Sequence, residues 1–232
     1  MTPPSRAGDD AGRQLHLDFP RADADARPLI ETGSYAAAVG ALRRWKLWPG
    51  AQLALVGDAA SGKSRLLRWW AGQAGAALVT GEALSTASMD EIAQLSVSAL
   101  AIDDANYPGA GLALLATLNL CRDRGAPVLL SGATEPAGWF DQPPDLRSRL
   151  VAIPVAHIEP PDDETLAARL REDSSLRHLN LPEESVVYLS NRMERSWSAV
   201  ARVADQIERT PRRAEGLRSA RAVLVALGMD PG

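Results

Sequence analysis

The sequence is poor in the residues that build disulfide frameworks and metal clusters. Its single cysteine, Cys121, excludes an internal disulfide and is most simply a buried structural thiol in a reducing compartment. The three histidines, His16, His157 and His178, lie far apart and lack the spacing of metal ligands. We therefore expect no metal cluster built on these residues.

Long apolar runs and an excess of positive charge are also missing. No stretch approaches the length of about 20 apolar residues that a transmembrane helix needs. Asp9 and Asp10 near the start disfavour a transit peptide. The net charge is −4, so no global basic field would attract nucleic acid. These absences predict a soluble, cytoplasmic protein with no membrane contact.

The first 27 residues are dominated by Ala, Arg, Asp, Pro and Gly, a composition that predicts a flexible tail. Within this tail, the stretch RQLHLDFPR at 13–21 places Leu15, Leu17 and Phe19 at alternating positions. In an extended peptide these three side chains share one face and could enter an apolar pocket, with Gln14 in a polar subsite. A stray amphipathic strand would show the same pattern.

Residues 28–159 alternate between apolar runs and helical patterns. The predicted strands are 52–57, 76–80, 98–105 and 126–132, and the predicted helices are 35–48, 64–75 and 111–124. A further strand at 150–158 would be confined to a sheet edge by Pro154. This alternation predicts an α/β subdomain with a parallel sheet covered by helices.

Residues 160–232 carry helical patterns and no strand pattern. The predicted helical segments are 162–173, 182–193, 196–209 and 212–228. Asp162 and Asp163 are candidate caps of the first segment, and Gly228 ends the last. The expected organisation is a tail (1–27), a nucleotide-binding α/β subdomain (28–159) and a small all-helical lid (160–232).

The sequence GDAASGKS at 57–64 has the pattern of a phosphate-binding loop between a strand and a helix. Gly57 and Gly62 allow backbone N–H groups to surround phosphates, while Lys63 reaches the β and γ phosphates. The Ser64 hydroxyl is suited to bind Mg²⁺. The residues expected at the nucleotide are Gly57, Asp58, Ala59, Ala60, Ser61, Gly62, Lys63, Ser64 and Arg65.

Asp103 and Asp104 follow the predicted third strand, where a magnesium-associated carboxylate belongs in such sheets. Asp103 is expected to bind Mg²⁺, and Asp104 to orient or deprotonate an attacking water. Ser131, at the end of the fourth strand, is expected near the γ-phosphate. The alternatives are a solvated acidic loop and an ordinary serine at a strand end.

Arginines and tryptophans supply further candidates. If DLRSRL at 145–150 is an extended segment, Arg147 or Arg149 could reach a neighbouring molecule's nucleotide as an arginine finger. Surface arginines are common, so the pattern alone carries little weight. The six tryptophans are expected to serve core and interface packing rather than stacking on bases.

Taken together, these motifs resemble the AAA+ family, in the branch of the bacterial replication initiator DnaA. The P-loop, IDDA, LLSG, DLRSRL and RMERS follow one another in that family's order across residues 28–227. The composition, PPDDETL and RMERSWSAV are similar to the Hda-type regulators of this branch. The resemblance implies that Asp103 is the Walker B aspartate, Arg149 the arginine finger supported by Arg147, and Arg195 a lid residue that reaches the nucleotide phosphates.

The resemblance also implies partners and cofactors. QLHLDF at 14–19 is similar to peptides that dock on the DNA polymerase III sliding clamp, through Gln14, Leu15, Leu17 and Phe19. The implied activity is regulation of replication initiation, by promoting hydrolysis of ATP bound to DnaA. ADP or ATP with Mg²⁺ would be the cofactor, intrinsic ATPase activity would be weak at most, DNA would be contacted only through the clamp, and a homodimer is compatible with this role.

Two other functions stay open at this stage. One is a DnaA-like initiator or helicase loader that works through its own ATP cycle, although a DNA-binding helix-turn-helix domain after the lid is not expected before Gly232. The other is a stand-alone ATPase, which the Asp103–Asp104 pair permits. Tight, salt-dependent DNA binding would favour the initiator.

Overall fold

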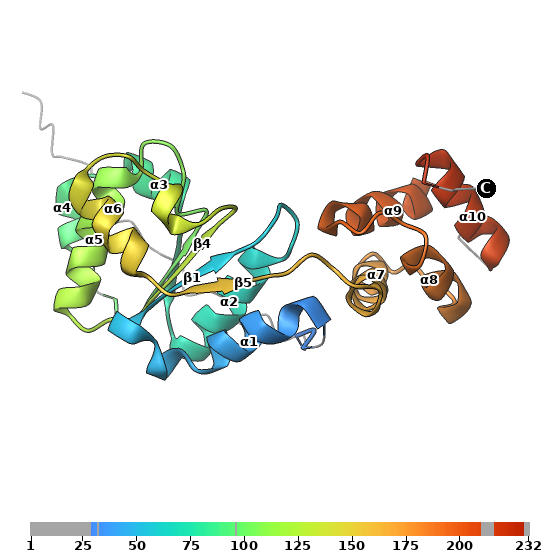
Figure 1. Cartoon of the computed structure of the whole chain (residues 1–232), viewed down its shortest axis with the longest axis horizontal. Helices are drawn as coiled ribbons and strands as arrows, with labels where there is room; N and C mark the ends of the chain where they lie inside the picture. Colours follow the sequence, from blue (N-terminus) through green and yellow to red (C-terminus); the bar gives the residue numbers. More distant parts are fainter. Residues whose placement is uncertain (1–28, 32, 96, 210–215, 230–232) are drawn as a thin grey trace, which may run out of the picture.

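In the computed structural model, the described residues 29–31, 33–95, 97–209 and 216–229 form an α/β subdomain followed by a bundle of helices (Figure 1). The expected clamp-binding residues Gln14, Leu15, Leu17 and Phe19 lie outside these residues. None of the helices in the described ranges is long and apolar enough to span a membrane.

The sheet has five parallel strands in the order β2-β3-β4-β1-β5. Their bounds are β1 Gln52–Val56, β2 Ala77–Thr80, β3 Leu100–Asp103, β4 Val128–Gly132 and β5 Val155–His157. The central strands are continuous apolar runs because helices cover both faces of the sheet. The predicted parallel sheet is confirmed, and β5 lies at an edge directly after Pro154.

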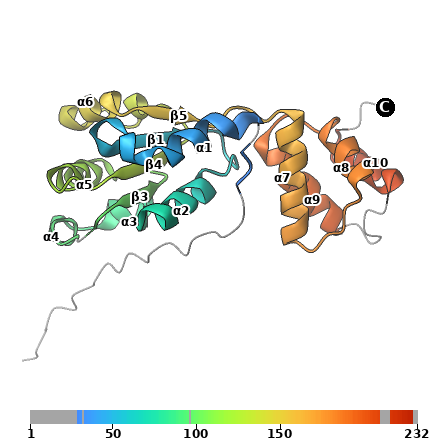
Figure 2. The same cartoon turned by 90° about the horizontal axis from the view of Figure 1, so that it is seen from below.

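Two sets of helices cover the sheet (Figures 1 and 2). One face is covered by α1 (Ala36–Arg43) and α2 (Lys63–Ala74). Short 3-10 turns lie before α1 at Gly33–Tyr35, and between α1 and β1 at Trp45–Leu47 and Pro49–Ala51. The other face is covered by α3 (Gly81–Thr86), α4 (Met89–Ala93), α5 (Gly111–Asp123) and α6 (Pro144–Ala152). A fourth 3-10 turn lies at Pro136–Gly138.

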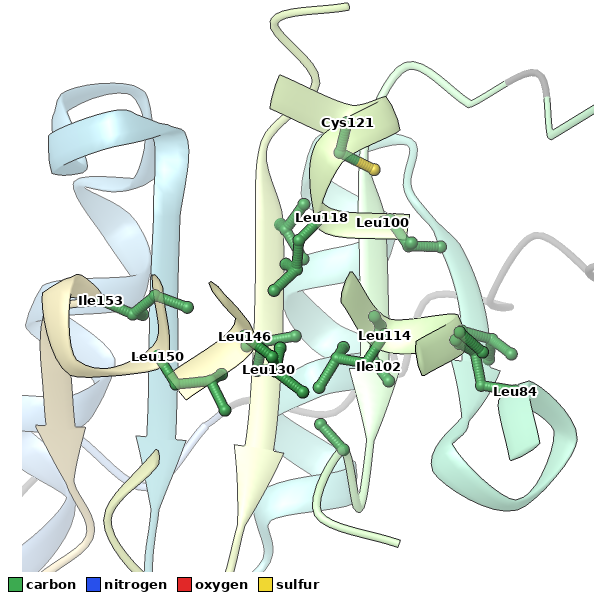
Figure 3. Packing of buried hydrophobic residues seen from close by; sticks show 14 of the residues in the cluster. Leu84, Leu100, Ile102, Leu114, Leu118, Cys121, Leu130, Leu146, Leu150 and Ile153 are labelled. Atoms are coloured by element: carbon green, nitrogen blue, oxygen red, sulfur yellow. The ribbon is translucent and has the colours of Figure 1, made fainter. Parts of the chain in front are cut away.

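The core under α5 and α6 is closely packed and apolar (Figure 3). Ile102 and Leu130, from neighbouring strands, are fully buried against Leu114 and Leu146 from these helices. Cys121 is buried in the same core, and burial raises the pKa of its thiol to about 11. The cysteine is therefore structural, as its isolation in the sequence predicted.

Tryptophans pack the opposite face of the sheet. Trp48 and Trp70 are buried and stacked with ring centroids 5.2 Å apart, and Trp45 meets Trp70 edge-on at 6.2 Å. The Trp48 indole N–H donates to the Ala41 carbonyl. Packing, rather than base stacking, is thus the role that these three side chains have in the fold.

The described C-terminal part contains four helices, α7 (Asp163–Leu176), α8 (Glu183–Ser190), α9 (Trp197–Arg209) and α10 (Leu217–Ala226). They enclose a separate apolar core that includes Leu166, Leu170, Leu189, Val203 and Leu224. Asp162 caps α7, with its carboxylate accepting from the Thr165 N–H at 2.8 Å. We call α7–α10 the helical subdomain.

Three segments differ from the sequence prediction. The helix expected over 35–48 ends at Arg43, because the chain tightens into 3-10 turns before Pro49. Helices α3 and α4 were not predicted, since each is too short to show a helical period; caps at Thr80 and Ser88 stabilise them. Residues 150–152 belong to α6, so the last strand is shorter than 150–158.

Candidate nucleotide-binding site

The loop 57–62 connects β1 to α2 at the carboxyl end of the sheet. Gly57 is buried, and a β-carbon there would lie 2.8 Å from the Ser61 hydroxyl and 3.0 Å from Ile158. Gly62 has φ +90°, a conformation that side-chain-bearing residues rarely adopt. Asp58, Ala59 and Ala60 are exposed at the tip. The sequence therefore folds here into a tight turn whose backbone leads into a helix N-terminus, as phosphate binding requires.

Lys63, the first residue of α2, folds its side chain back onto this loop. Its ammonium donates to the carbonyl oxygens of Gly57 and Asp58, each at 2.8 Å, and the residue is 8% exposed. Burial lowers the pKa of Lys63, while the nearby carboxylates of Asp104, Asp103 and Asp58 oppose that shift. The lysine is thus a buried cation near the carboxylates at the end of β3.

Asp103, Asp104 and Ser131 are brought together by the pairing of β3 with β4. The Ser131 hydroxyl donates to the Asp103 carboxylate at 2.6 Å and accepts from the Asp104 N–H at 2.9 Å. Asp104 adopts a left-handed backbone with φ +50°. The hydrogen bond that the Asp104 N–H donates to Ser131 helps to hold this conformation, which few residues other than Gly, Asn and Asp adopt. In this structure Ser131 orients the acidic pair directly.

The donor set fits a hard cation. Ser64 at the start of α2 and Asp103 at the end of β3 offer oxygen atoms, the ligands that Mg²⁺ takes together with water and substrate phosphates. In the described ranges, no group of three or more His, Cys, Asp or Glu residues could hold a metal ion by itself. Ser64 and Asp103 would supply two ligands of such an ion, beside water and the phosphates of a bound nucleotide.

Tyr35, which the sequence analysis did not single out, contacts the loop. Its hydroxyl donates to the Ser61 carbonyl oxygen, and a β-carbon on Gly62 would lie 2.7 Å from that hydroxyl. On its other side, the Tyr35 ring packs against Trp197 of α9 with centroids 4.9 Å apart. A tyrosine in an apolar helical pattern carries no sequence signal of such a contact.

Arg65, predicted near the nucleotide, pairs with a carboxylate of the helical subdomain. Its guanidinium lies 2.5 Å from Glu172 of α7, and Arg169 lies 3.0 Å from the same carboxylate. The Arg65 and Glu172 side chains are only 10% and 16% exposed. This ion pair joins α2 to α7 beside the loop, and the sequence pattern RLRED gave no indication of it.

Arg195, expected to reach the phosphates from the lid, lies before α9. Its guanidinium pairs with Asp163 at the start of α7, at 3.0 Å, and its side chain is 69% exposed. In this arrangement the arginine is held at the surface of the helical subdomain, close to the N-terminus of α7.

The segment with Arg147 and Arg149 differs from the extended form considered for it from the sequence. It is not extended but forms α6, which begins with Pro144 at its first position and Asp145 in its first turn. Residues two apart share a face in an extended segment but point in different directions on a helix. Arg149 is half-buried and, with Arg122, Asp145, Ser148 and Ala152, lines a shallow open depression between α5 and α6.

The position of α6 separates Arg149 from the helical subdomain. Helix α6 lies on the far side of the α/β subdomain from α7–α10 in both views (Figures 1 and 2). Arg147 is exposed on the same helix. These guanidinium groups are therefore presented at an outer surface of the molecule.

No family model matches the sequence, and no curated protein matches it. Among solved structures, domain III of the Thermotoga maritima replication initiation protein DnaA aligns with a TM-score of 0.66 and 22% identity, over 87% of this chain and 95% of that one. AMPPCP-bound DnaA from Aquifex aeolicus aligns with a TM-score of 0.63 and 15% identity, over 79% of this chain and 64% of that one. A Thermotoga maritima RuvB mutant aligns with a TM-score of 0.59 and 18% identity, over 85% and 69%.

This chain thus spans nearly all of an isolated DnaA domain III but less than two thirds of the longer Aquifex DnaA. The sheet order, the loop between β1 and α2, and the helical subdomain after β5 agree with the likeness. The chain therefore has the AAA+ P-loop NTPase fold in its DnaA-like form.

Proposed function

We propose that this protein is an adenine-nucleotide-binding regulator of replication initiation, of the Hda type. It binds the DNA polymerase sliding clamp and promotes hydrolysis of ATP bound to DnaA. The observation that carries the proposal is the combination of a DnaA-like AAA+ fold with an arginine-bearing outer helix, α6, remote from the helical subdomain.

Nucleotide binding is supported by the loop and its surroundings. The buried Lys63, the glycine turn before α2 and the acidic pair held by Ser131 supply a cation, backbone donors and magnesium ligands. The structural likeness to an AMPPCP-bound DnaA favours an adenine nucleotide, ADP or ATP. Gly57–Arg65, Asp103 and Ser131 are the residues that we propose to hold it with Mg²⁺, with Asp104 orienting a water molecule and Arg195 as the lid contact.

Action on a partner ATPase is supported by Arg149. A guanidinium at an outer surface can approach the γ-phosphate of a nucleotide bound to a neighbouring molecule and stabilise charge that develops during hydrolysis. The two flanking groups Arg122 and Asp145 line the same depression. DnaA is the proposed partner because AAA+ modules of one kind can pack against each other with one module's arginine at the next module's site.

The clamp contact rests on sequence. Leu15, Leu17 and Phe19 form an alternating ladder of large apolar side chains in the composition-biased residues 1–27, and the polar Gln14 precedes it. A peptide of this kind, tethered ahead of a folded module, would raise the concentration of that module at DNA-loaded clamps.

The test is hydrolysis of ATP bound to DnaA, measured in single turnover with clamp loaded on DNA. The full chain is expected to accelerate the reaction, and Arg149→Ala is expected to lose most of that acceleration, since arginine fingers contribute a factor of about 10³ or more. Arg218→Ala, at an exposed position on α10, is the matched control. Gln14→Ala with Leu17→Ala should abolish clamp pull-down and the clamp-dependent part of the acceleration.

Two results would argue against the proposal. Acceleration by Arg149→Ala equal to that of the natural chain would remove the finger role. Rapid ATP hydrolysis by the chain alone, unaffected by DnaA and clamp, would favour an ATPase with its own cycle, a function that the organised Asp103–Ser131–Asp104 cluster also suits.

A further inference from the structure

One buried side chain contacts both the P-loop and the helical subdomain. Tyr35 is 3% exposed at the end of the first 3-10 turn. Its hydroxyl donates to the Ser61 carbonyl oxygen, while its ring packs against Trp197 of α9. Any motion of α9 that carries Trp197 away would therefore alter the surroundings of the loop.

The carbonyl that Tyr35 binds belongs to the peptide between Ser61 and Gly62. A peptide unit is planar and trans, so its C=O and N–H point to opposite sides. Fixing the Ser61 carbonyl therefore fixes the direction of the Gly62 N–H. Gly62 precedes α2, and N–H groups at a helix start lack intrahelical acceptors and are available to phosphate oxygens.

The Ser61–Gly62 peptide needs an anchor because glycine restricts backbone rotation less than any other residue. Gly62 has φ +90° and no β-carbon, so the 61–62 peptide could turn at little steric cost. Burial raises the pKa of Tyr35, against the opposing effect of Arg169 and Arg65, so the phenol stays protonated and remains a donor. The hydroxyl thus provides a permanent anchor for the carbonyl.

The turn that carries Tyr35 is itself attached to the helical subdomain. The Ser34 N–H donates to the Thr165 hydroxyl of α7 at 3.3 Å, and the Ser34 hydroxyl donates to the Pro160 carbonyl at 2.5 Å. The ion pair of Arg65 with Glu172 joins α2 to α7 at the same junction. These bonds make the position of Tyr35 depend on that of α7 and α9.

We propose that Tyr35 is a positioning residue of the nucleotide site, which orients the Ser61–Gly62 peptide toward the phosphates and couples that orientation to the helical subdomain through Trp197. This inference rests on the nucleotide binding included in the proposed function. It adds a residue that acts through the backbone of the loop and does not touch the nucleotide itself.

The direct test is the affinity for ADP with Mg²⁺, measured by calorimetry on the full chain. Tyr35→Phe keeps the ring on Trp197 and removes only the hydroxyl, so we expect an affinity about tenfold weaker, the equivalent of one hydrogen bond. The matched control is Tyr188→Phe, because the Tyr188 ring lies beside Arg192 in the helical subdomain. Thermal melting without nucleotide reports any loss of fold separately.

Coupling is tested by Trp197→Phe in both backgrounds. In the natural chain it should weaken ADP binding several-fold, and in the Tyr35→Phe background it should cause no further loss, because both changes act through one hydrogen bond. Equal losses in the two backgrounds would overturn the coupling. If Tyr35→Phe does not fold, Trp197→Phe carries the test alone, and an unchanged ADP affinity overturns the inference.

The outcomes also separate this inference from the proposed function. A natural chain that binds ADP and a Tyr35→Phe variant that binds it equally well would reject the role of Tyr35 only. A natural chain that binds neither ADP nor ATP would reject both. Loss of ADP affinity in Tyr35→Phe with Tyr188→Phe unchanged supports the inference.

Discussion

Cationic residues expected at the nucleotide are held differently in the two subdomains. In the α/β subdomain, Lys63 and Arg65 are each 8% exposed and bonded to the loop or to Glu172. In the helical subdomain, Arg195 is 69% exposed and pairs with Asp163 at the surface. Burying charge is costly unless it is paired, so the first arrangement is preorganised, whereas the second can change at little cost. Arg195 can therefore leave Asp163 at little cost, whereas Lys63 and Arg65 are held in place.

The apolar cores of the two subdomains, by contrast, are built alike. The core on the α5–α6 face of the sheet and the core within α7–α10 are separate clusters of fully buried aliphatic side chains. Trp197, at the start of α9, belongs to neither; it packs with Tyr35, Leu66 and Ile158 on the α1–α2 face. Trp197 thus extends the α1–α2 core to the helical subdomain, and polar bonds join α7 to α2 and to the first 3-10 turn.

The largest expected effect compares equivalent leucines in the two cores. Leu130→Ala on β4 and Leu170→Ala on α7 each remove a fully buried side chain, and each should lower the free energy of unfolding by about 2–5 kcal/mol. Because the junction links the subdomains, we expect both variants to shift one common transition in urea, monitored by circular dichroism. Two separate transitions, with Leu170→Ala moving only one of them, would show that the junction does not couple folding.

The features that could be predicted from the sequence are those with a local sequence signal. The sheet, the loop at 57–64 and the acidic pair at 103–104 were predicted because apolar runs and glycine spacing are local signals. The short helices α3 and α4 lack a visible period, and their caps at Thr80 and Ser88 become evident only once the helices are known.

The junction could not be predicted for a different reason. Ser61 meets Tyr35 across 26 residues, and Arg65 meets Glu172 across 107. Such pairs depend on how α7 and α9 return to the α/β subdomain, which no local pattern encodes. The helical form of DLRSRL was missed because two arginines alternate there as they would in a strand, although Pro144 and Asp145 are typical of a helix start.

A smaller effect is expected from weakening the charged contact of the junction. Glu172→Gln removes the negative charge that Arg65 and Arg169 share, and should lower the free energy of unfolding by about 2–3 kcal/mol, since the pair is largely buried. It should also weaken ADP binding, because α7 is then held less firmly beside the loop. Glu184→Gln, at an exposed position on α8, is the matched control for urea unfolding. Equal stability of the two variants would mean that the buried pair does not stabilise the junction.

The smallest effect is expected at the start of α7, where the two subdomains meet in sequence. Asp162→Ala removes the cap of α7 and should cost about 1 kcal/mol in urea unfolding, while Asp162→Asn keeps a capping oxygen and should cost less.

The pH dependence of the same variants separates charge from capping. Hydrogen bonds from Thr165 hold the pKa of Asp162 below its usual value. A carboxyl whose pKa is lowered by folding stabilises the protein above its unfolded pKa, near 4, and this contribution is lost as the pH falls through the folded value. The natural chain should therefore lose stability over this acidic range more steeply than Asp162→Asn, whose amide does not titrate. Melting curves of both chains between pH 7 and pH 3 measure the difference. Parallel pH profiles would show that the negative charge of Asp162 adds nothing to the stability that its hydrogen bond provides.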